Sequence, residues 1–259
     1  MPSDLRVSSQ TAKGQEIEDQ SFAIIDAEVG PHPYSALEWP VVRRAIHATA
    51  DFEFARSSGP IFHPRAIDAG LAALRSGKPV IADVDMVRVG INMARLSKYG
   101  GSVQSFISDP DVIDTAKRQG TTRAVISMRK AAPLMDGAVV VNGNAPTALL
   151  EVVRLVRAGE VRPGLIVGVP VGFVSAPEAK EALLGLSVPY ITNPGRKGGS
   201  TVAIAIVNAL LALAEEHPLT LTLSPAGGEG TERAPSPSPR ERAGVRVPSA
   251  DANNQERDG

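Results

Sequence analysis

The stretch Ala138-Val-Val-Val-Asn-Gly-Asn-Ala-Pro-Thr147 joins an apolar run to a helical pattern through a single glycine. Because a short valine run bounded by a turn favours a buried strand, we expect a strand over Ala138–Asn142 and a helix over Ala145–Ala158. Asn144 can cap that helix, and Pro146 suits its first turn. The N–H groups at the helix start can also hold an anion, although a purely structural turn would have the same pattern.

The same strand–turn–helix unit recurs along the chain. We expect further strands at Phe52–Arg56, Pro79–Asp83, Val103–Ser108, Leu165–Val169 and Pro189–Thr192. We expect further helices at Glu16–Glu28, Ala36–Ala50, Pro64–Ser76, Asp109–Gln119, Thr122–Ala132, Ala176–Leu184 and Ser200–Ala214. Strands that alternate with helices indicate right-handed βαβ crossovers. The predicted fold is therefore α/β, a three-layer α/β/α sandwich with a mostly parallel sheet.

Composition limits the chemistry that the chain can perform. The 259 residues include no cysteine, which excludes disulfides, thiolate nucleophiles and zinc–cysteine sites. The polar N-terminal stretch lacks the apolar core of a signal peptide. The longest apolar run, Val202–Ala214, is shorter than the roughly 20 residues that span a bilayer. We expect a cytoplasmic protein with no membrane partner.

The last 45 residues differ in composition from the rest of the chain. Residues 215–259 are rich in proline, glycine and serine and contain no aromatic side chain, so we expect a disordered tail after a folded domain over residues 1–214. The tail carries eight acidic residues and five arginines, which leaves the folded domain slightly basic. That surplus is too small for general nucleic-acid binding, but it suits local sites for a small polyanion.

Two basic segments are candidates for anion recognition. Arg43-Arg44-Ala-Ile-His47 places a histidine and two arginines on one helical face, beside an apolar stripe of Trp39, Val42 and Ile46. His47 can thus be a proton donor that faces an anionic ligand, or an ordinary surface histidine. Asn193-Pro-Gly-Arg-Lys-Gly-Gly-Ser200 places two cations among glycines at a helix start, which suits a carboxylate or phosphate but differs from a Walker A loop.

Other motifs support fewer conclusions. Arg123, after Gly120-Thr-Thr, can project from a first helical turn toward the same edge of the sheet. Asp83 and Asp85 have no third ligand nearby, so we expect no metal site. Gly168-Val-Pro-Val-Gly172 lacks the glycine fingerprint of a dinucleotide site.

Seven segments of the chain, in order, resemble the precorrin-8X methylmutase family of cobalamin biosynthesis, which includes cobalt-precorrin-8 methylmutases. The resemblance covers residues from about 15 to 213 and implies a flavodoxin-like fold, a homodimer, no cofactor and a catalytic domain over residues 1–214. The segments are Ser21-Phe-Ala-Ile-Ile25, Val41–Thr49, Asp83-Val-Asp-Met-Val87, Gly120-Thr-Thr-Arg123, Gly143-Asn-Ala-Pro-Thr-Ala-Leu149, Gly168-Val-Pro-Val-Gly-Phe-Val174 and Gly195-Arg-Lys-Gly-Gly-Ser200.

The resemblance also implies a reaction. Members of the family move a methyl group from C11 to C12 of a tetrapyrrole, which gives hydrogenobyrinate or its cobalt counterpart, cobyrinate. His47 matches the family's catalytic histidine, a general acid, and Ser21 and Arg123 match positions that contact the ligand. The segments Gly120–Arg123 and Gly195–Ser200 resemble the cobalt-dependent branch slightly more.

Such a substrate is flat and fringed with carboxylates, which calls for an apolar floor and peripheral cations. We expect carboxylate contacts from Arg43, Arg44, Asn144, Arg196, Lys197, Gly198, Gly199 and Ser200. Arg43 and Arg44 are expected to disfavour the protonated imidazole of His47 until a bound polycarboxylate reverses the local field. Substrate binding should then drive proton uptake.

Two alternatives belong to other functional classes. A non-catalytic tetrapyrrole-binding or carrier protein would bind a coloured ligand without changing it. A nucleotide-binding oxidoreductase could use a flavodoxin-like sheet, but its phosphate fingerprint is missing.

Overall fold

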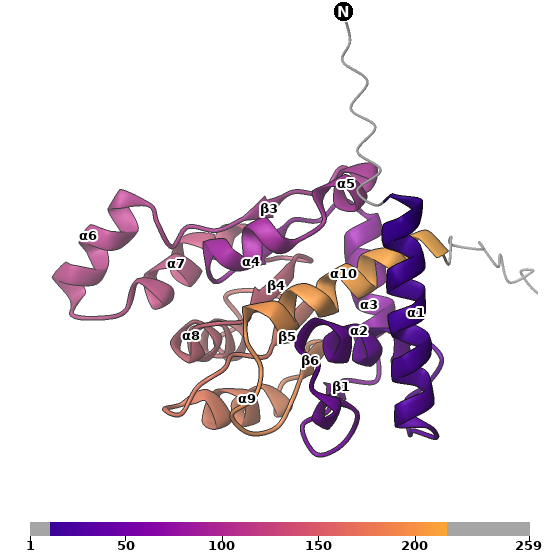
Figure 1. The fold of residues 1–259 in the computed structure, drawn as a ribbon. Coiled ribbons are helices and arrows are strands. Elements are labelled where there is room, and N and C mark those ends of the chain that lie inside the picture. Colours follow the sequence, from indigo (N-terminus) through magenta and orange to yellow (C-terminus); the bar gives the residue numbers. More distant parts are fainter. Residues whose placement is uncertain (1–10, 217–259) are drawn as a thin grey trace, which may run out of the picture. The chain divides into compact units, whose positions relative to one another are not determined.

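The computed structural model describes residues 11–216, and over these residues it contains one six-stranded sheet in the order β1-β6-β5-β4-β2-β3 (Figure 1). All neighbouring strands are parallel except β1, which pairs antiparallel with β6. From His217 onward, the predicted tail lies outside the described residues. The strands are β1 (Ile61–Phe62), β2 (Val80–Ala82), β3 (Val103–Gln104), β4 (Val139–Asn142), β5 (Leu165–Gly168) and β6 (Tyr190–Thr192).

The strand order confirms the flavodoxin-like prediction. Counted from β2, the five parallel strands lie in the order 2-1-3-4-5, which is the flavodoxin-like arrangement. The chain leaves β2 for the edge strand β3 and then returns to the other side of β2 as β4. The loops after β2 and β4 therefore diverge from a topological switch point, where ligands of such sheets bind beyond the carboxyl ends of the strands.

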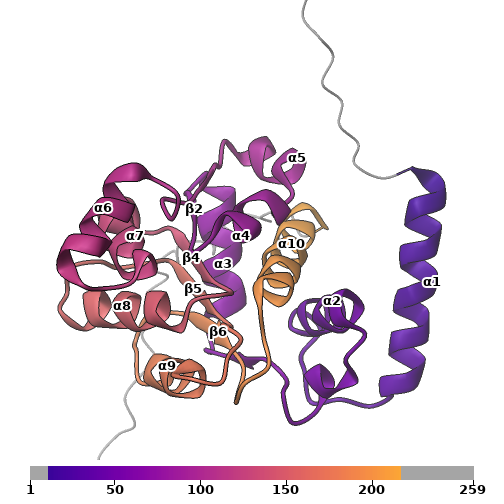
Figure 2. The same ribbon diagram turned by 60° about the vertical axis from the view of Figure 1, so that its left-hand side comes forward.

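Helices cover both faces of the sheet (Figure 2). Helices α2, α3 and α10 belong to one layer, helices α7, α8 and α9 belong to the other, and α1 lies outside α2. The helices are α1 (Ala12–Val29), α2 (Trp39–Thr49), α3 (Ala66–Arg75), α4 (Asp85–Gly90), α5 (Met93–Leu96), α6 (Pro110–Gln119), α7 (Arg123–Ala131), α8 (Pro146–Arg157), α9 (Ala176–Leu184) and α10 (Ser200–Glu216), with short 3-10 turns η1 (Phe52–Ala55), η2 (Ser97–Tyr99) and η3 (Ala132–Leu134).

Alternate residues of each central strand enter two different hydrophobic cores. In β4, Val139 and Val141 pack with α2, α3 and α10, whereas Val140 packs with α7, α8 and α9. A strand that is buried on both faces needs apolar residues at every position, which is why the central strands appear in the sequence as unbroken apolar runs. The three-layer prediction is confirmed.

Local side-chain bonds explain where the structure differs from the predicted elements. The strand predicted at Phe52–Arg56 is wrong: these residues form η1, because the Asp51 carboxylate accepts the N–H of Glu53 at 3.0 Å and starts a turn. The antiparallel edge strand is β1 instead. Helices α4 and α5 were not predicted, and α10 extends two residues past its predicted end.

Two segments, Ser35–Glu38 and Ser175–Glu178, have the Ser-x-x-Glu spacing that predicts a capping box, and the two predictions have opposite outcomes. Ser35 and Glu38 exchange bonds, with Glu38 N–H donating to Ser35 Oγ at 3.3 Å and Ser35 N–H donating to Glu38 Oε2 at 2.9 Å. This box precedes α2, which begins at Trp39. Ser175 makes no capping bond, because its φ of 62° places it in the left-handed region. That second box is wrong.

Two adjacent leucines of α8 test the core. Leu149 is fully buried between α8 and the sheet, whereas Leu150 is 36% exposed. We expect Leu149→Ala to lower the free energy of unfolding by about 2–5 kcal/mol, because it removes buried methyl groups and leaves a cavity. Leu150→Ala is the matched control and should lower the free energy of unfolding by less than half as much. Urea unfolding of both variants measures the difference, and equal losses would contradict the assigned core.

Candidate functional site

His47 lies on α2, a helix that packs on α10 and faces α1 on its other side. Ala45 and Ile46 are buried toward the core, which leaves the His47 imidazole exposed. The edge of this imidazole meets the ring of Phe22 on α1, with the ring centroids 5.3 Å apart and the planes at 67°. His47 is therefore solvent-accessible and flanked on one side by an aromatic ring.

The two arginines beside His47 are already paired. Arg43 Nη1 lies 2.8 Å from Asp26 Oδ2, and Arg44 Nη2 lies 2.7 Å from Glu18 Oε1, with both carboxylates on α1. Both guanidinium groups also lie near the Phe22 ring, at 4.4 and 5.2 Å from its centroid. The sequence predicts two cations beside His47, and in the structure α1 supplies a carboxylate for each of them.

Ser21 precedes Phe22 on α1. Its Oγ donates to the carbonyl of Ile17 at 2.7 Å, and the residue is half-buried. The ion pairs of Arg43 and Arg44 hold α1 against α2. They thereby hold the Phe22 ring beside His47. Ser21 precedes Phe22 on the same helix.

The loop from β6 to α10 carries the second basic segment. Gly198 has φ +148°, and a Cβ there would collide with the carbonyl oxygen of Val169, so this position requires glycine. The N–H of Gly199 donates to the same carbonyl at 2.8 Å. Ser200 follows as the buried first residue of α10. The glycines thus let the loop approach the end of β5 closely.

The two basic side chains of this loop have different surroundings. Lys197 Nζ lies 2.6 Å from Asp51 Oδ2, just after α2, and this hydrogen bond lowers the pKa of Asp51. Arg196 is exposed and lies over the ring of Phe173, 5.4 Å from its centroid. Phe173 and Val174 are themselves 80% and 82% exposed. The Lys197 pair links the loop to the His47 helix, while Arg196 and the apolar Phe173 face solvent together.

The loop after β4 is closed by an internal carboxylate. The N–H groups of Asn144 and Ala145 donate to Asp83 Oδ2 at 2.7 and 2.9 Å, and Asp83 is fully buried. Of the two alternatives that the sequence leaves open here, an anion site or a structural turn, the structure thus shows the structural turn. The N-cap of α8 is Ala145, so the predicted cap Asn144 is wrong, although Pro146 does begin the helix. The Asn144 side chain is left exposed.

The sequence did not predict the structural role of Asp83. This residue directly follows β2 at the switch point, and that position was the signal available in the sequence. Among residues 11–216, no group of three His, Cys, Asp or Glu side chains could hold a metal ion. The role visible in the structure is to hold the turn that leads into α8.

Further contacts join the predicted residues along one edge of the sheet. Thr122 Oγ1 and Thr147 Oγ1 lie 3.1 Å apart, which links the start of α7, where Arg123 is exposed, to the start of α8. Gly143 packs against Ser200, because a Cβ on Gly143 would lie 2.9 Å from Ser200 Cα. The starts of α7, α8 and α10 therefore meet at the carboxyl edge, and Lys197 connects this edge to the end of α2.

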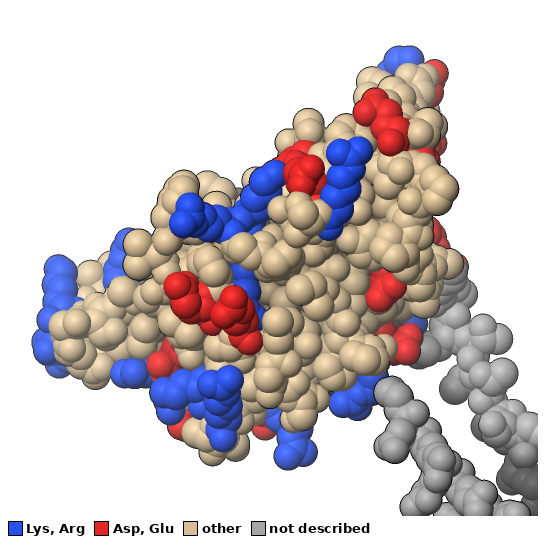
Figure 3. All heavy atoms as spheres, turned by 90° about the horizontal axis from the view of Figure 1, so that it is seen from below, with Lys and Arg blue, Asp and Glu red and all other residues tan. Residues whose placement is uncertain are grey.

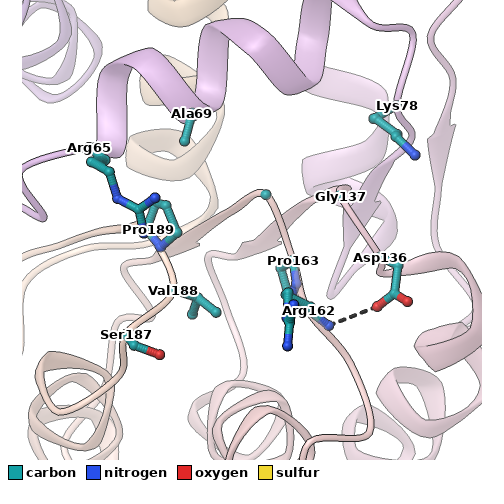
Figure 4. A pocket seen from close by; sticks show the side chains of 11 residues that line it. Arg65, Ala69, Lys78, Asp136, Gly137, Arg162, Pro163, Ser187, Val188 and Pro189 are labelled. Carbon is teal, nitrogen blue, oxygen red and sulfur yellow. Dashed lines mark hydrogen bonds between the residues drawn. The ribbon is translucent and has the colours of Figure 1, made fainter.

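A cavity of about 800 Å³ lies at the opposite edge of the sheet (Figure 4). Lys78, Gly137, Gly164 and Pro189, which line it, precede β2, β4, β5 and β6 respectively. Since ligands of open α/β sheets bind beyond the carboxyl ends of the strands, we place the candidate site at the edge that carries the predicted residues and not in this cavity.

The surface charges are mixed. On the face in Figure 3, Lys and Arg side chains lie in separate groups with Asp and Glu nearby, and no continuous basic surface is visible there. In the part of the chain that the structure describes, every helix is too short or too polar to cross a membrane.

Known proteins resemble this chain over most of its length. A family model described as Precorrin-8X methylmutase matches residues 16–213. A Cobalt-precorrin-8 methylmutase from Priestia megaterium is 56% identical over 205 residues, which are 79% of this chain and 90% of that protein. One of the same name from Leptospira interrogans is 51% identical over 215 residues, which are 80% and 97%. A crystal structure of precorrin-8X methylmutase from Thermus thermophilus has TM-score 0.73 and 46% identity, covering 78% of this chain and 97% of that one.

The buried carboxyl of Asp83 should produce a pH-dependent stability. Burial raises its pKa above 3.8, against the N–H bonds that lower it. The folded state thus holds this proton more tightly than the unfolded chain does, and this contribution to stability is lost as the pH rises from the unfolded pKa through the folded pKa. The Asp83→Asn variant has no carboxyl proton at this position and does not lose this contribution. Its free energy of unfolding minus that of wild type should therefore increase as the pH rises over that interval. Urea unfolding from about pH 4 to about pH 8 measures this difference. A constant difference would contradict the assignment.

Proposed function

Since this chain belongs to the precorrin-8X methylmutase family and is therefore an isomerase, we propose that it moves a methyl group from C11 to C12 of precorrin-8X or cobalt-precorrin-8. The product is hydrogenobyrinate or cobyrinate, an intermediate of cobalamin biosynthesis. The family match carries this proposal, because it extends from α1, which holds Ser21 and Phe22, to α10.

We propose the cobalt form as the preferred substrate. The relatives that are 56% and 51% identical to this chain are both named Cobalt-precorrin-8 methylmutase, which supports this choice. Cobalt would arrive inside the substrate, and the protein would need no cofactor.

His47 is the proposed general acid. Its exposed imidazole can reach a bound macrocycle, while the Phe22 ring covers one side of it. The exposed Arg123 and Arg196, with the Asn144 amide, are the first choice for the peripheral carboxylates, because Arg43 and Arg44 are already paired with α1. The exposed Phe173 offers an apolar surface beside Arg196. Arg43 and Arg44 remain weaker candidates, together with Lys197, Gly198, Gly199 and Ser200.

We further propose that the protein acts as a cytoplasmic homodimer. Met86 and Val89 on α4 are 64% and 70% exposed, and because they are three residues apart they lie on one face of the helix, where a second copy could bury them. Light scattering on the purified protein measures the mass of the assembly.

Removal of the imidazole tests the reaction. Purified wild type should convert cobalt-precorrin-8, followed by its visible spectrum, and His47→Ala should reduce kcat by about a hundredfold or more while it keeps most of its ligand affinity. His63→Ala, which removes a histidine at the other edge, is the control and should keep its turnover. If wild type converts neither cobalt-precorrin-8 nor precorrin-8X, the enzyme proposal is wrong. Coloured binding without a new product would instead support a carrier protein.

Proton uptake tests the role of His47 as an acid. In the free protein the charges beside His47 are balanced by ion pairs, so a bound polycarboxylate makes the local field negative and favours the protonated imidazole. We expect wild type to take up more protons than His47→Ala when the reaction product binds. Calorimetric titrations in buffers of different ionisation enthalpy measure this uptake, and equal uptake by the two proteins would contradict the mechanism.

A further inference from the structure

Lys180 on α9 is a buried lysine without an acidic partner in the described part of the chain. It is 2% exposed, and its ammonium donates to two backbone carbonyls, at 3.0 Å to Gly195 and 2.5 Å to Lys197. Burial lowers its pKa to about 8. An ammonium that is buried without a carboxylate lowers the free energy of unfolding. Lys180 is therefore retained at a cost to the stability of the fold.

Both carbonyls belong to the loop between β6 and α10. Asn193 Nδ2 also donates to the carbonyl of Lys197, at 2.9 Å, so two buried side chains converge on that one oxygen. Gly195 has φ +69°, which bends the loop around these donors. The loop is therefore held from inside, through its carbonyls.

Holding the carbonyls inward leaves the other groups of the loop directed outward. Arg196, between the two bonded carbonyls, is exposed and lies over Phe173. Lys197 reaches outward to Asp51. The loop then enters α10 at Ser200. The positive charge of Lys180 lies on the inner side of the loop. It also favours an anion on the outer side, because the two charges interact through the low-dielectric interior.

We propose that Lys180 is a positioning residue that pre-forms the loop from Gly195 to Gly199 for the carboxylates of the substrate. The proposal rests on the proposed function, which makes this loop part of the binding site. Lys180 itself touches no substrate. Its charge-assisted bonds set the conformation of the loop before the ligand arrives, so that binding spends less free energy on ordering it.

The test compares KM, kcat and stability in Lys180→Met. We expect KM for cobalt-precorrin-8 to rise about tenfold or more, with kcat within about threefold of wild type, because the loop binds the substrate but does not perform the proton transfer. The urea midpoint should change little, because removal of a buried charge without a carboxylate partner offsets the loss of its two hydrogen bonds. Lys180→Gln, which keeps a donor without the charge, should recover part of the affinity. Lys78→Met, at the opposite edge, is the matched control and should leave KM unchanged.

Hydrogen exchange of the loop amides gives a readout that needs no substrate. The amides of residues 195–199 should exchange faster in Lys180→Met than in wild type, with the remaining amides unchanged. Unchanged exchange together with unchanged KM would overturn the proposal, as would a lower urea midpoint accompanied by a general loss of kcat. If Lys180→Met does not fold, Lys180→Gln carries the same comparison. If wild type converts no substrate, the proposed function fails, and the exchange result still decides whether Lys180 orders the loop.

Discussion

The packing of α2 against α10 is the contact on which the candidate site depends. Helix α10 lies on the sheet, and α2 places Val42, Ala45 and Ile46 against the same hydrophobic core. Through this contact the exposed His47 takes its position relative to the strands. The same helix, α10, begins in the glycine-rich loop at the carboxyl edge. A shift of α10 would therefore move the histidine and the loop together, and the Lys197–Asp51 pair adds a second link between them.

Internal charges occupy several positions that the sequence suggests for ligands. Asp83 holds the N–H groups at the start of α8, Asp26 and Glu18 pair with Arg43 and Arg44, and Asp51 pairs with Lys197. In each case a protein carboxylate stands where a substrate carboxylate could bind. Among the candidate cations within residues 11–216, Arg123 and Arg196 are those for which the structure shows no internal carboxylate, and we propose that they bind the substrate carboxylates. The paired groups instead fix the geometry of the site.

The sheet could be predicted from the sequence because its strands are buried on both faces. Val139–Val141 form an unbroken apolar run, and the glycine after them marks the turn into α8. The short β1 has two residues and no such pattern, and the Asp51 turn overrides the apparent strand at Phe52. Pairings such as Asp83 with Asn144, or Arg43 with Asp26, join residues far apart in the chain. No local pattern indicates these pairings. The charged residues of the site could therefore be identified from the sequence, but their ion-pair partners could not. The buried state of Lys180 is likewise a property of packing.

We propose that a tetrapyrrole binds across the carboxyl edge of the sheet with its macrocycle facing His47. A crystal structure of the protein with bound hydrogenobyrinate tests it most directly. We expect peripheral carboxylates within hydrogen-bond distance of Arg123 or Arg196 and the imidazole of His47 directed at the macrocycle. A macrocycle bound in the cavity at the opposite edge, between Arg65 and Arg162, would contradict it.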